Sequence, residues 1–231
     1  MQTVEDYLSG QVLLIDKPLH VTSFDVVNKL RWGIKNAFNI KKIKVGHAGT
    51  LDPLATGLLI ICTGKMTKQI DTFQGQVKEY TGTFVLGSTT PSYDLETEID
   101  KIYPTDHITE SLIRETTKQF IGDIEQLPPV FSAIKKDGKR LYEFARAGEA
   151  VEIKSRMVNI SEFEITSITD NTIEFRVVCS KGTYIRSLAH DFGKIIGSGA
   201  HLSVLRRTKI GDFDVKNAIS PIEFIKQLPH K

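Results

Sequence analysis

The sequence predicts an α+β fold in which helices and strands surround one mixed sheet. Apolar and polar residues alternate in segments such as 77–86, which is typical of strands. In other segments, such as 26–38, apolar residues recur at helical spacing. No repeat period and no low-complexity linker divides the 231 residues. We therefore expect a single domain over residues 1–231.

Strands are expected where apolar runs end at turn residues. The first run ends at the turn Lys17-Pro18, and a tight hairpin around Asp170-Asn171 joins two later runs. The expected strands are 11–16, 58–62, 77–86, 157–169, 172–179 and 203–210.

Helices are expected where periodic segments carry end signals. Thr22 and Asp25 form a pattern typical of a capping box, so a helix begins there and runs to about Phe38. Gly122 and Gly197 follow two other periodic segments and are typical of helix ends. The expected helices are 22–38, 109–120, 140–147 and 184–196.

Composition indicates a soluble protein. Hydrophobic residues make up 40% and charged residues 25% of the chain, which is ordinary for a globular domain. The N-terminus has no basic segment leading into a long apolar one, and the longest apolar run, 58–62, is too short to span a membrane. Cys62 and Cys179 are expected to be buried free thiols. We expect a cytoplasmic protein without a membrane partner.

Positive charge is concentrated in one part of the chain, although the net charge is only +2. No acidic residue lies between Val26 and Leu51, whereas six cations do. Such a segregated positive face suits the phosphate backbone of a nucleic acid. The alternative is a set of solvated helix faces without a partner. The cations are Lys29, Arg31, Lys35, Lys41, Lys42 and Lys44.

Several common functional motifs are excluded. The segment 63–67 lacks the spacing of a phosphate-binding loop, because Gly57 lies too far upstream and Met66 replaces the hydroxyl residue. Gly197 and Gly199 lack the third glycine of a dinucleotide fingerprint. The histidines lack metal-ligand spacing, and no hydrolase nucleophile elbow is present. We expect neither a metal nor a cofactor.

The segment Gly46–Leu59 is the most informative part of the sequence. It places one carboxylate, Asp52, among three glycines and Pro53, and the apolar run 58–62 follows. This pattern predicts a rigid, tightly turned loop that presents one aspartate, as a nucleophile or general base requires. Alternatively, Asp52 is a structural residue, since aspartate before proline commonly starts turns.

The loop sequence GHAGTLDPLATGLL resembles the catalytic signature of the TruB-type tRNA pseudouridine synthases. This resemblance implies the pseudouridine synthase fold, with a central, mainly antiparallel sheet flanked by helices. It implies that Asp52 is catalytic, that Gly46 and His47 belong to the substrate site, and that His47 stabilises a flipped nucleotide. Taken alone, a histidine in such a loop is equally a structural hydrogen-bonder.

Two further segments extend the resemblance. It implies that Tyr80 stacks on the target base and takes part in proton transfer, whereas alone Tyr80 is a half-buried sheet aromatic. The segment KGTYIR resembles a family motif whose arginine, here Arg186, pairs with the catalytic aspartate. A guanidinium beside a partly buried carboxylate keeps that carboxylate ionised and orients it. Tyr184 of this motif is assigned to substrate binding, and the alternative for Arg186 is a surface charge.

The segment 199–208 resembles a family segment that contacts the substrate. The resemblance implies that Leu205 packs against the uracil ring and that Arg206 and Arg207 lie toward the RNA. The alternative is a buried strand that ends in exposed arginines.

A basic and aromatic segment at about 130–150 resembles the family's mobile thumb, an insertion that closes on tRNA. Its candidate RNA-binding residues are Lys135, Lys139 and Arg140.

The resemblance runs from the segment LIDKP, which contains Lys17, to Arg207. Lys17 and Asp94 match family positions and are assigned to the substrate site. Before Asp94 the chain reads TPSY where many members have an additional aspartate. Many members also continue into a small C-terminal RNA-binding domain, whereas 20 residues follow Gly211 here. We therefore expect the catalytic domain with its thumb and no separate C-terminal domain.

Together these features predict an isomerase that converts the T-loop uridine-55 of tRNA to pseudouridine without a cofactor. The enzyme must flip the stacked uridine out of its loop. Asp52 then attacks the ribose C1′ or assists glycosidic cleavage by a related covalent route, and the uracil rebonds through C5. Glycoside hydrolysis would usually need two catalytic carboxylates and a water. The expected partner is the tRNA T arm and loop, and we expect a monomer.

Two alternatives belong to other classes. One is a guide-dependent or rRNA-directed pseudouridine synthase. The other is a non-catalytic module that binds or folds tRNA.

Overall fold

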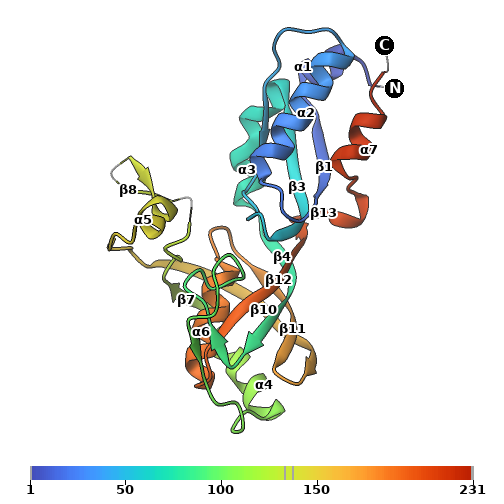
Figure 1. Ribbon diagram of the computed structural model, residues 1–231. Coiled ribbons are helices and arrows are strands. Elements are labelled where there is room, and N and C mark those ends of the chain that lie inside the picture. The colour runs from blue at the N-terminus through green and yellow to red at the C-terminus, as the bar shows by residue number, and fades with distance from the viewer. Residues whose placement is uncertain (1, 133, 137, 230–231) are drawn as a thin grey trace. The chain divides into compact units, whose positions relative to one another are not determined.

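The computed structural model describes residues 2–132, 134–136 and 138–229 (Figure 1). The chain divides into two compact units, unit 1 with residues 1–80 and 205–231 and unit 2 with residues 81–204. Strands β4 (Lys78–Leu86) and β12 (Ala200–Ile210) contribute to both units. That the chain forms a single domain stays a prediction. None of the described helices is long and apolar enough to cross a membrane.

Unit 1 combines strands with a long helix and several helices of six residues or fewer. Its strands, besides parts of β4 and β12, are β1 (Val12–Lys17), β2 (Val45–His47), β3 (Ala55–Thr63) and β13 (Phe213–Asp214). Its helices are α1 (Val4–Ser9), α2 (Ser23–Ala37), the 3₁₀ helix η1 (Gly64–Gln69), α3 (Ile70–Gly75), the 3₁₀ helix η2 (Val215–Asn217) and α7 (Pro221–Lys226).

Strand β3 is buried on both faces, which explains why its sequence is a continuous apolar run. Leu59 and Ile61 pack into a core with residues of α1, α2 and α7. Leu58, Ile60 and Cys62 point to the other face, where residues of η1, α3 and β13 cover them. The strand at the centre of unit 1 is therefore fixed from two sides.

Unit 2 contains the remaining elements. Its strands are β5 (Ser88–Thr89), β6 (Lys101–Ile102), β7 (Gly122–Gln126), β8 (Lys135–Lys136), β9 (Lys139–Arg140), β10 (Arg156–Thr169) and β11 (Thr172–Cys179). Its helices are α4 (Glu110–Lys118), α5 (Leu141–Ala147) and α6 (Ile185–Ile196). Aromatic rings make much of its core, and the rings in mutual contact belong to Phe84, Phe120, Phe163, Phe175 and Phe192.

Hydrogen bonding connects the strands of the main sheet in the order β1-β3-β12-β4-β11-β10-β7. Strand β1 is antiparallel to β3, and β10 is antiparallel to both β11 and β7. Strand β12 runs parallel to β3, with Leu205 opposite Ala55 and Arg207 opposite Gly57. The predicted α+β class with a mixed, mainly antiparallel sheet is confirmed.

The long predicted elements are present, with boundaries shifted by a few residues. The predicted helix 22–38 is α2, and the hairpin around Asp170 joins β10 to β11. Short elements escaped prediction: α1, β2, α3, β7 and α7. Two of these helices had a readable signal, because capping boxes begin them at Thr3 and Ser220.

Candidate active site

The loop that carries Asp52 connects β2 to β3 in unit 1 and is held on both sides of this residue. On one side, the backbone N–H of Leu51 donates to Ser23 Oγ at 2.9 Å, and Ser23 Oγ donates back to the Leu51 carbonyl at 3.1 Å. On the other side, the His20 N–H donates to the Pro53 carbonyl at 2.8 Å. The Ala55 N–H donates to the Asp52 carbonyl at 3.0 Å and closes the turn. The half-buried Asp52 is thus presented from a fixed backbone.

Gly57 allows the two strands beside this loop to approach closely. Its φ of +105° lies in the region that favours glycine. A Cβ at this position would lie 2.2 Å from the carbonyl oxygen of Arg207 on β12. Glycine is therefore required for β3 to pair with β12 at this point.

Arg207 fixes the start and the end of the Asp52 loop from inside the protein. Its Nη2 donates to the Gly49 carbonyl at 3.1 Å, and its Nε donates to the Leu58 carbonyl at 2.8 Å. The residue is 1% exposed. The prediction that Arg207 lies toward the RNA is corrected here, because its guanidinium is buried against backbone carbonyls.

Arg206 points to the opposite face of β12 and is partly exposed. It forms a bidentate ion pair with Asp16 of β1, with nitrogen–oxygen distances of 3.0 and 2.7 Å. Its contact with RNA stays a prediction.

Lys17 is also buried. Its Nζ donates to the carbonyls of Pro18 at 2.8 Å and Val21 at 2.6 Å. Burial lowers the pKa of Lys17 to about 8; the negative charge of Asp52 opposes this effect and the positive charge of Arg207 adds to it. The assignment of Lys17 to substrate binding is corrected, since the side chain has no exposure and serves the turn that follows β1.

His47 ends β2, next to the Asp52 loop. Its Nδ1 is buried and has no hydrogen-bond partner among the described residues. Burial and the charge of Arg207 lower the pKa of His47, and a hydrogen bond with the Gly49 backbone opposes this shift. The contact of His47 with a flipped nucleotide stays a prediction. The residue before it, Gly46, lies close to Ile70: a Cβ at position 46 would be 2.8 Å from Ile70 Cδ1, so the Ile70 side chain would have to shift.

Tyr80 and Leu205 lie on β4 and β12, and both are at most 9% exposed. In the register of β12 with β3, Leu205 is opposite Ala55, three residues after Asp52. Their contacts with the target base stay predictions.

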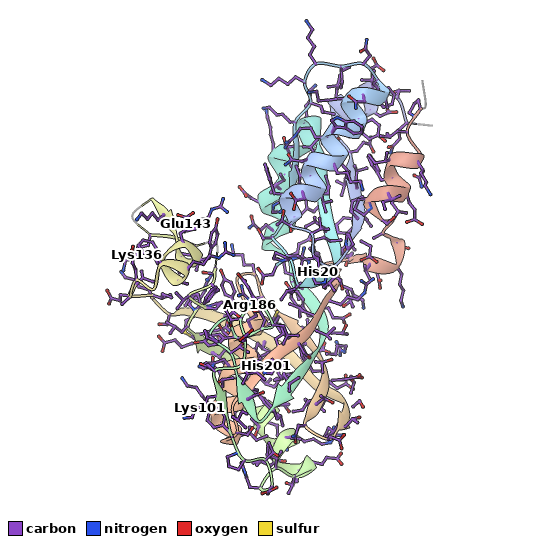
Figure 2. The ribbon with its side chains drawn as sticks, viewed as in Figure 1. His20, Lys101, Lys136, Glu143, Arg186 and His201 are labelled. Atoms are coloured by element: carbon purple, nitrogen blue, oxygen red, sulfur yellow. The ribbon has the colours of Figure 1, made fainter. Side chains whose placement is uncertain are left out.

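In unit 2, Arg186 lies in the first turn of α6 and is 3% exposed (Figure 2). Its Nε is 3.6 Å from Oδ2 of Asp94, and its Nη1 donates to the Ser92 carbonyl at 3.4 Å. The predicted site residues Arg186 and Asp94 therefore form a buried ion pair, and Asp94 orients the arginine.

The segment before Asp94 is a compact, hydrogen-bonded turn. The hydroxyls of Thr90 and Ser92 donate to the Asp94 carbonyl at 2.6 and 3.1 Å, and Asp94 Oδ1 accepts from the Glu96 N–H at 3.0 Å. The ring of Tyr93 stacks on His190 of α6, with 3.9 Å between the centroids. The stack holds this turn on the helix that carries Arg186. Sequence reasoning missed Tyr93 and His190, since neither lies in a motif.

The backbone of Tyr184, just before α6, is fixed by the Gln126 side chain. The Tyr184 N–H donates to Gln126 Oε1 at 2.7 Å, and Gln126 Nε2 donates to the Tyr184 carbonyl at 3.1 Å. The guanidinium of Arg156 lies over the Tyr184 ring, 4.7 Å from its centroid. The role of Tyr184 in substrate binding stays a prediction.

The thumb segment consists of β8, β9 and α5, and its cations gather on aromatic rings. Arg140 and Arg146 lie 5.8 and 5.3 Å from the ring centroid of Tyr142, and Lys139 Nζ lies 5.6 Å from that of Phe144. Figure 2 shows Lys136 and Glu143 in the same segment. The side chain of Lys135 lies outside the described residues. The RNA contacts of the thumb stay predictions.

Within the described part of the chain, no group of three or more histidine, cysteine, aspartate or glutamate residues could hold a metal ion.

Comparisons with known proteins agree with this arrangement. A sequence model described as TruB family pseudouridylate synthase (N terminal domain) matches residues 35–185, and one described as tRNA pseudouridylate synthase B C-terminal domain matches residues 186–227. A tRNA pseudouridine synthase B from Flavobacterium johnsoniae is 68% identical over 98% of this chain and 99% of its own length. A protein of the same name from Parabacteroides distasonis is 57% identical over 94% of this chain and 93% of its own.

Solved structures show the same fold. A chain in the crystal structure of a Cbf5-Nop10-Gar1 complex aligns with a TM-score of 0.68 and 31% identity, covering 92% of this chain and 52% of its own. A chain in the structure of an H/ACA RNP bound to a substrate RNA containing 2′-deoxyuridine aligns with a TM-score of 0.69 and 28% identity, covering 97% of this chain. This chain spans about half the length of those two chains.

The fold and the Asp52 loop define a pseudouridylate synthase, an RNA-modifying isomerase. The sequence matches then identify the family within this class of enzymes. The chain belongs to the TruB family.

Proposed function

We propose that this enzyme converts uridine-55 in the T loop of tRNA to pseudouridine. The observation that carries the proposal is the loop of Asp52, a single acid on a backbone fixed by Ser23, His20 and Arg207. The relatives that match nearly the whole chain are named tRNA pseudouridine synthase B, which supports tRNA as the substrate.

The proposed reaction is an isomerisation that conserves all atoms. The bond between C1′ and N1 breaks, the uracil rotates, and a bond forms between C1′ and C5. The proton on C5 is released and N1 gains a proton. Asp52 supplies the anionic oxygen that stabilises C1′, either by direct attack or by a related covalent route. Tyr80 is the group we propose for the proton transfer at C5.

A flipped uridine must be held outside its stack, at a cost of a few kcal/mol. We propose that Tyr80 stacks on the uracil and that Leu205 packs on its other face. His47 would donate or accept a hydrogen bond through its buried ring nitrogen. In this mechanism Arg186 keeps Asp52 ionised, and Asp94 holds Arg186 in place, as the 3.6 Å ion pair between them supports.

We also infer that the enzyme acts as a cytoplasmic monomer on the T arm and loop, with the thumb segment closing on the RNA. Light scattering of the purified protein would give its mass, and a mass twice 25.9 kDa would contradict the monomer. Fractionation of cells would test the compartment.

Release of tritium from C5-labelled uridine in an unmodified tRNA transcript tests the reaction. The wild type should release one equivalent, and Asp52→Asn should release none while still binding the transcript. Undiminished release by Asp52→Asn would contradict the proposed mechanism, and tight binding without release by the wild type would favour a non-catalytic tRNA-binding module.

The resemblance to the H/ACA-associated structures favours a second candidate, a guide-dependent or rRNA-directed synthase. An unmodified rRNA fragment in the same assay separates the two. Release from tRNA alone supports the first candidate, and release from rRNA in the presence of a guide supports the second.

A further inference from the structure

The outer face of helix α2 carries side chains to which no role has been assigned above. The inner face of the helix, Val26, Val27, Leu30 and Ile34, is buried in the core of unit 1. The remaining face is open to solvent and combines aromatic, cationic and amide side chains with one carboxylate. This outer face comprises Phe24, Asp25, Asn28, Lys29, Trp32 and Asn36, with the partly exposed Arg31 and Lys35 at its edges.

Two of these side chains are large and exposed. Phe24 is 61% and Trp32 is 64% exposed. Exposed aromatic side chains are common on surfaces that bind single strands of nucleic acid, because bases stack on them. Here they lie among cations rather than among apolar residues, so the face does not resemble a site for another apolar helix.

The charges of this face lack acidic partners. Within the described residues, Lys29 and Lys35 form no ion pair. The only acid on the helix, Asp25, accepts hydrogen bonds from the N–H and hydroxyl of Thr22 in the capping box. The loop that follows α2 adds exposed lysines and no acid, namely Lys41, Lys42 and Lys44. Unpaired cations beside aromatic rings complement a phosphate backbone.

The N-terminal end of the helix lies against the Asp52 loop. Ser23, the neighbour of Phe24, makes the two hydrogen bonds to the backbone of Leu51, and Leu51 is adjacent to Asp52. From Phe24 to Lys35 the helix extends about 16 Å away from this point. Arg31 donates to the Val45 carbonyl at 2.9 Å and so ties the middle of the helix to β2, which leads into the same loop.

We propose that the outer face of α2 is an additional RNA-binding surface, which contacts the strand next to the target uridine. Lys29 and Lys35 bind phosphates, and Phe24 and Trp32 pack on bases or riboses. The backbone of this face is already helical without RNA, so only its side chains need to be ordered on binding. This inference rests on the proposed RNA substrate and adds a place on the enzyme where that RNA is held.

Trp32 is the only tryptophan of the chain, so its fluorescence reports on this face alone. We expect an unmodified tRNA transcript at saturating concentration to reduce the quenching of Trp32 by acrylamide at least about twofold, since a base or ribose would cover the indole. Both the wild type and Asp52→Asn, which has no turnover, should show the effect. Unchanged quenching in a saturated complex would overturn the proposal. Protection without RNA, rising with protein concentration, would show a contact between copies and would overturn it as well.

A double variant and a matched control test the contribution to binding. Trp32→Ala with Lys29→Gln removes one ring and one charge from α2. Ile222→Ala with Lys226→Gln removes one exposed apolar side chain and one charge from α7, in the same unit. The α2 variant should bind the transcript about tenfold more weakly, and its slope of log affinity against log salt should be smaller by about 0.8. The α7 variant should bind the transcript with an affinity within about twofold of that of the wild type, because a single charge far from the RNA contributes little to binding.

The kinetics separate this surface from the catalytic machinery. At saturating RNA the α2 variant should keep the turnover of the wild type, with the loss confined to KM. Equal binding by the two double variants would overturn the inference. If the wild type releases no tritium but RNA protects Trp32, the proposed function is contradicted and the proposed RNA-binding surface is supported. If the wild type releases tritium and Trp32 stays accessible in the complex, the surface is contradicted and the proposed function is supported.

Discussion

Arg207 donates a hydrogen bond from Nη2 to the carbonyl oxygen of Gly49, across 158 residues of sequence. Because the same guanidinium also reaches the Leu58 carbonyl, one buried side chain holds both arms of the loop that presents Asp52. A charged group in this place serves rigidity rather than recognition of RNA. Its positive charge also lowers the pKa values of its neighbours Lys17 and His47.

We expect Arg207→Gln to lower the free energy of unfolding by about 3 kcal/mol, because two buried carbonyls lose their donor. Urea unfolding measures this loss. The neighbouring variant Arg206→Gln is the control: it removes a partly exposed ion pair with Asp16 and should cost at most about 1 kcal/mol. Equal losses for the two variants would contradict the role of Arg207.

A second prediction concerns the buried ion pair in unit 2. Asp94→Asn leaves the charge of Arg186 less compensated and should destabilise the protein by about 3 kcal/mol. Activity should fall even where the variant is fully folded, because Arg186 loses its orientation. Thermal unfolding and tritium release measure the two effects. Glu96→Gln, in the exposed pair with Arg146, should change stability by less than about 1 kcal/mol; a comparable loss there would show that burial of the pair is irrelevant.

The sequence predicted the tight turn around Asp52 well because its determinants are local. Glycines, a proline and an apolar strand stand within fourteen residues, and each acts on its immediate neighbours. The long helices and strands were likewise predictable, since their periodic patterns reflect burial in one or two cores.

Lys17 and Arg207 were misplaced for the opposite reason. Charged residues are nearly always on the surface, so a sequence suggests exposure for them. What buries these two is a set of carbonyl oxygens, and for Arg207 these belong to segments far away in the chain. The stack of Tyr93 on His190 was hidden in the same way, since no local pattern joins the two residues.

A third prediction tests the approach of β3 to β12. Gly57→Ala should destabilise the protein by about 3 kcal/mol or more, because the new methyl group meets the backbone of Arg207 and alanine disfavours the positive φ. The pairing of Leu205 with Ala55 should loosen, and hydrogen exchange of the Ala55 and Arg207 amides should become faster. Gly75→Ala at the end of α3 is the matched control, since no atom lies within 4 Å of the added Cβ. If both glycine variants are equally stable, close packing at Gly57 is not required.

The last prediction concerns stability in acid. Burial, aided by the charge of Lys194, lowers the pKa of His190 from 6.5 to about 4, while Asp100 opposes the shift. Between these values the unfolded chain binds a proton that the folded protein does not, so the free energy of unfolding falls as the pH falls from about 6.5 to about 4. At about 1.4 kcal/mol for each pKa unit, the loss approaches about 3 kcal/mol. The variant His190→Phe keeps a ring to stack on Tyr93 and cannot take up a proton, so its stability should decline less over this range. Burial raises the pKa of Asp191, so Asp191 makes the folded protein more stable as the pH falls. This contribution is the same in both proteins and cancels from the difference between them. Urea unfolding of the two proteins at half-unit steps of pH measures this difference, and parallel profiles would show that His190 is not the group responsible.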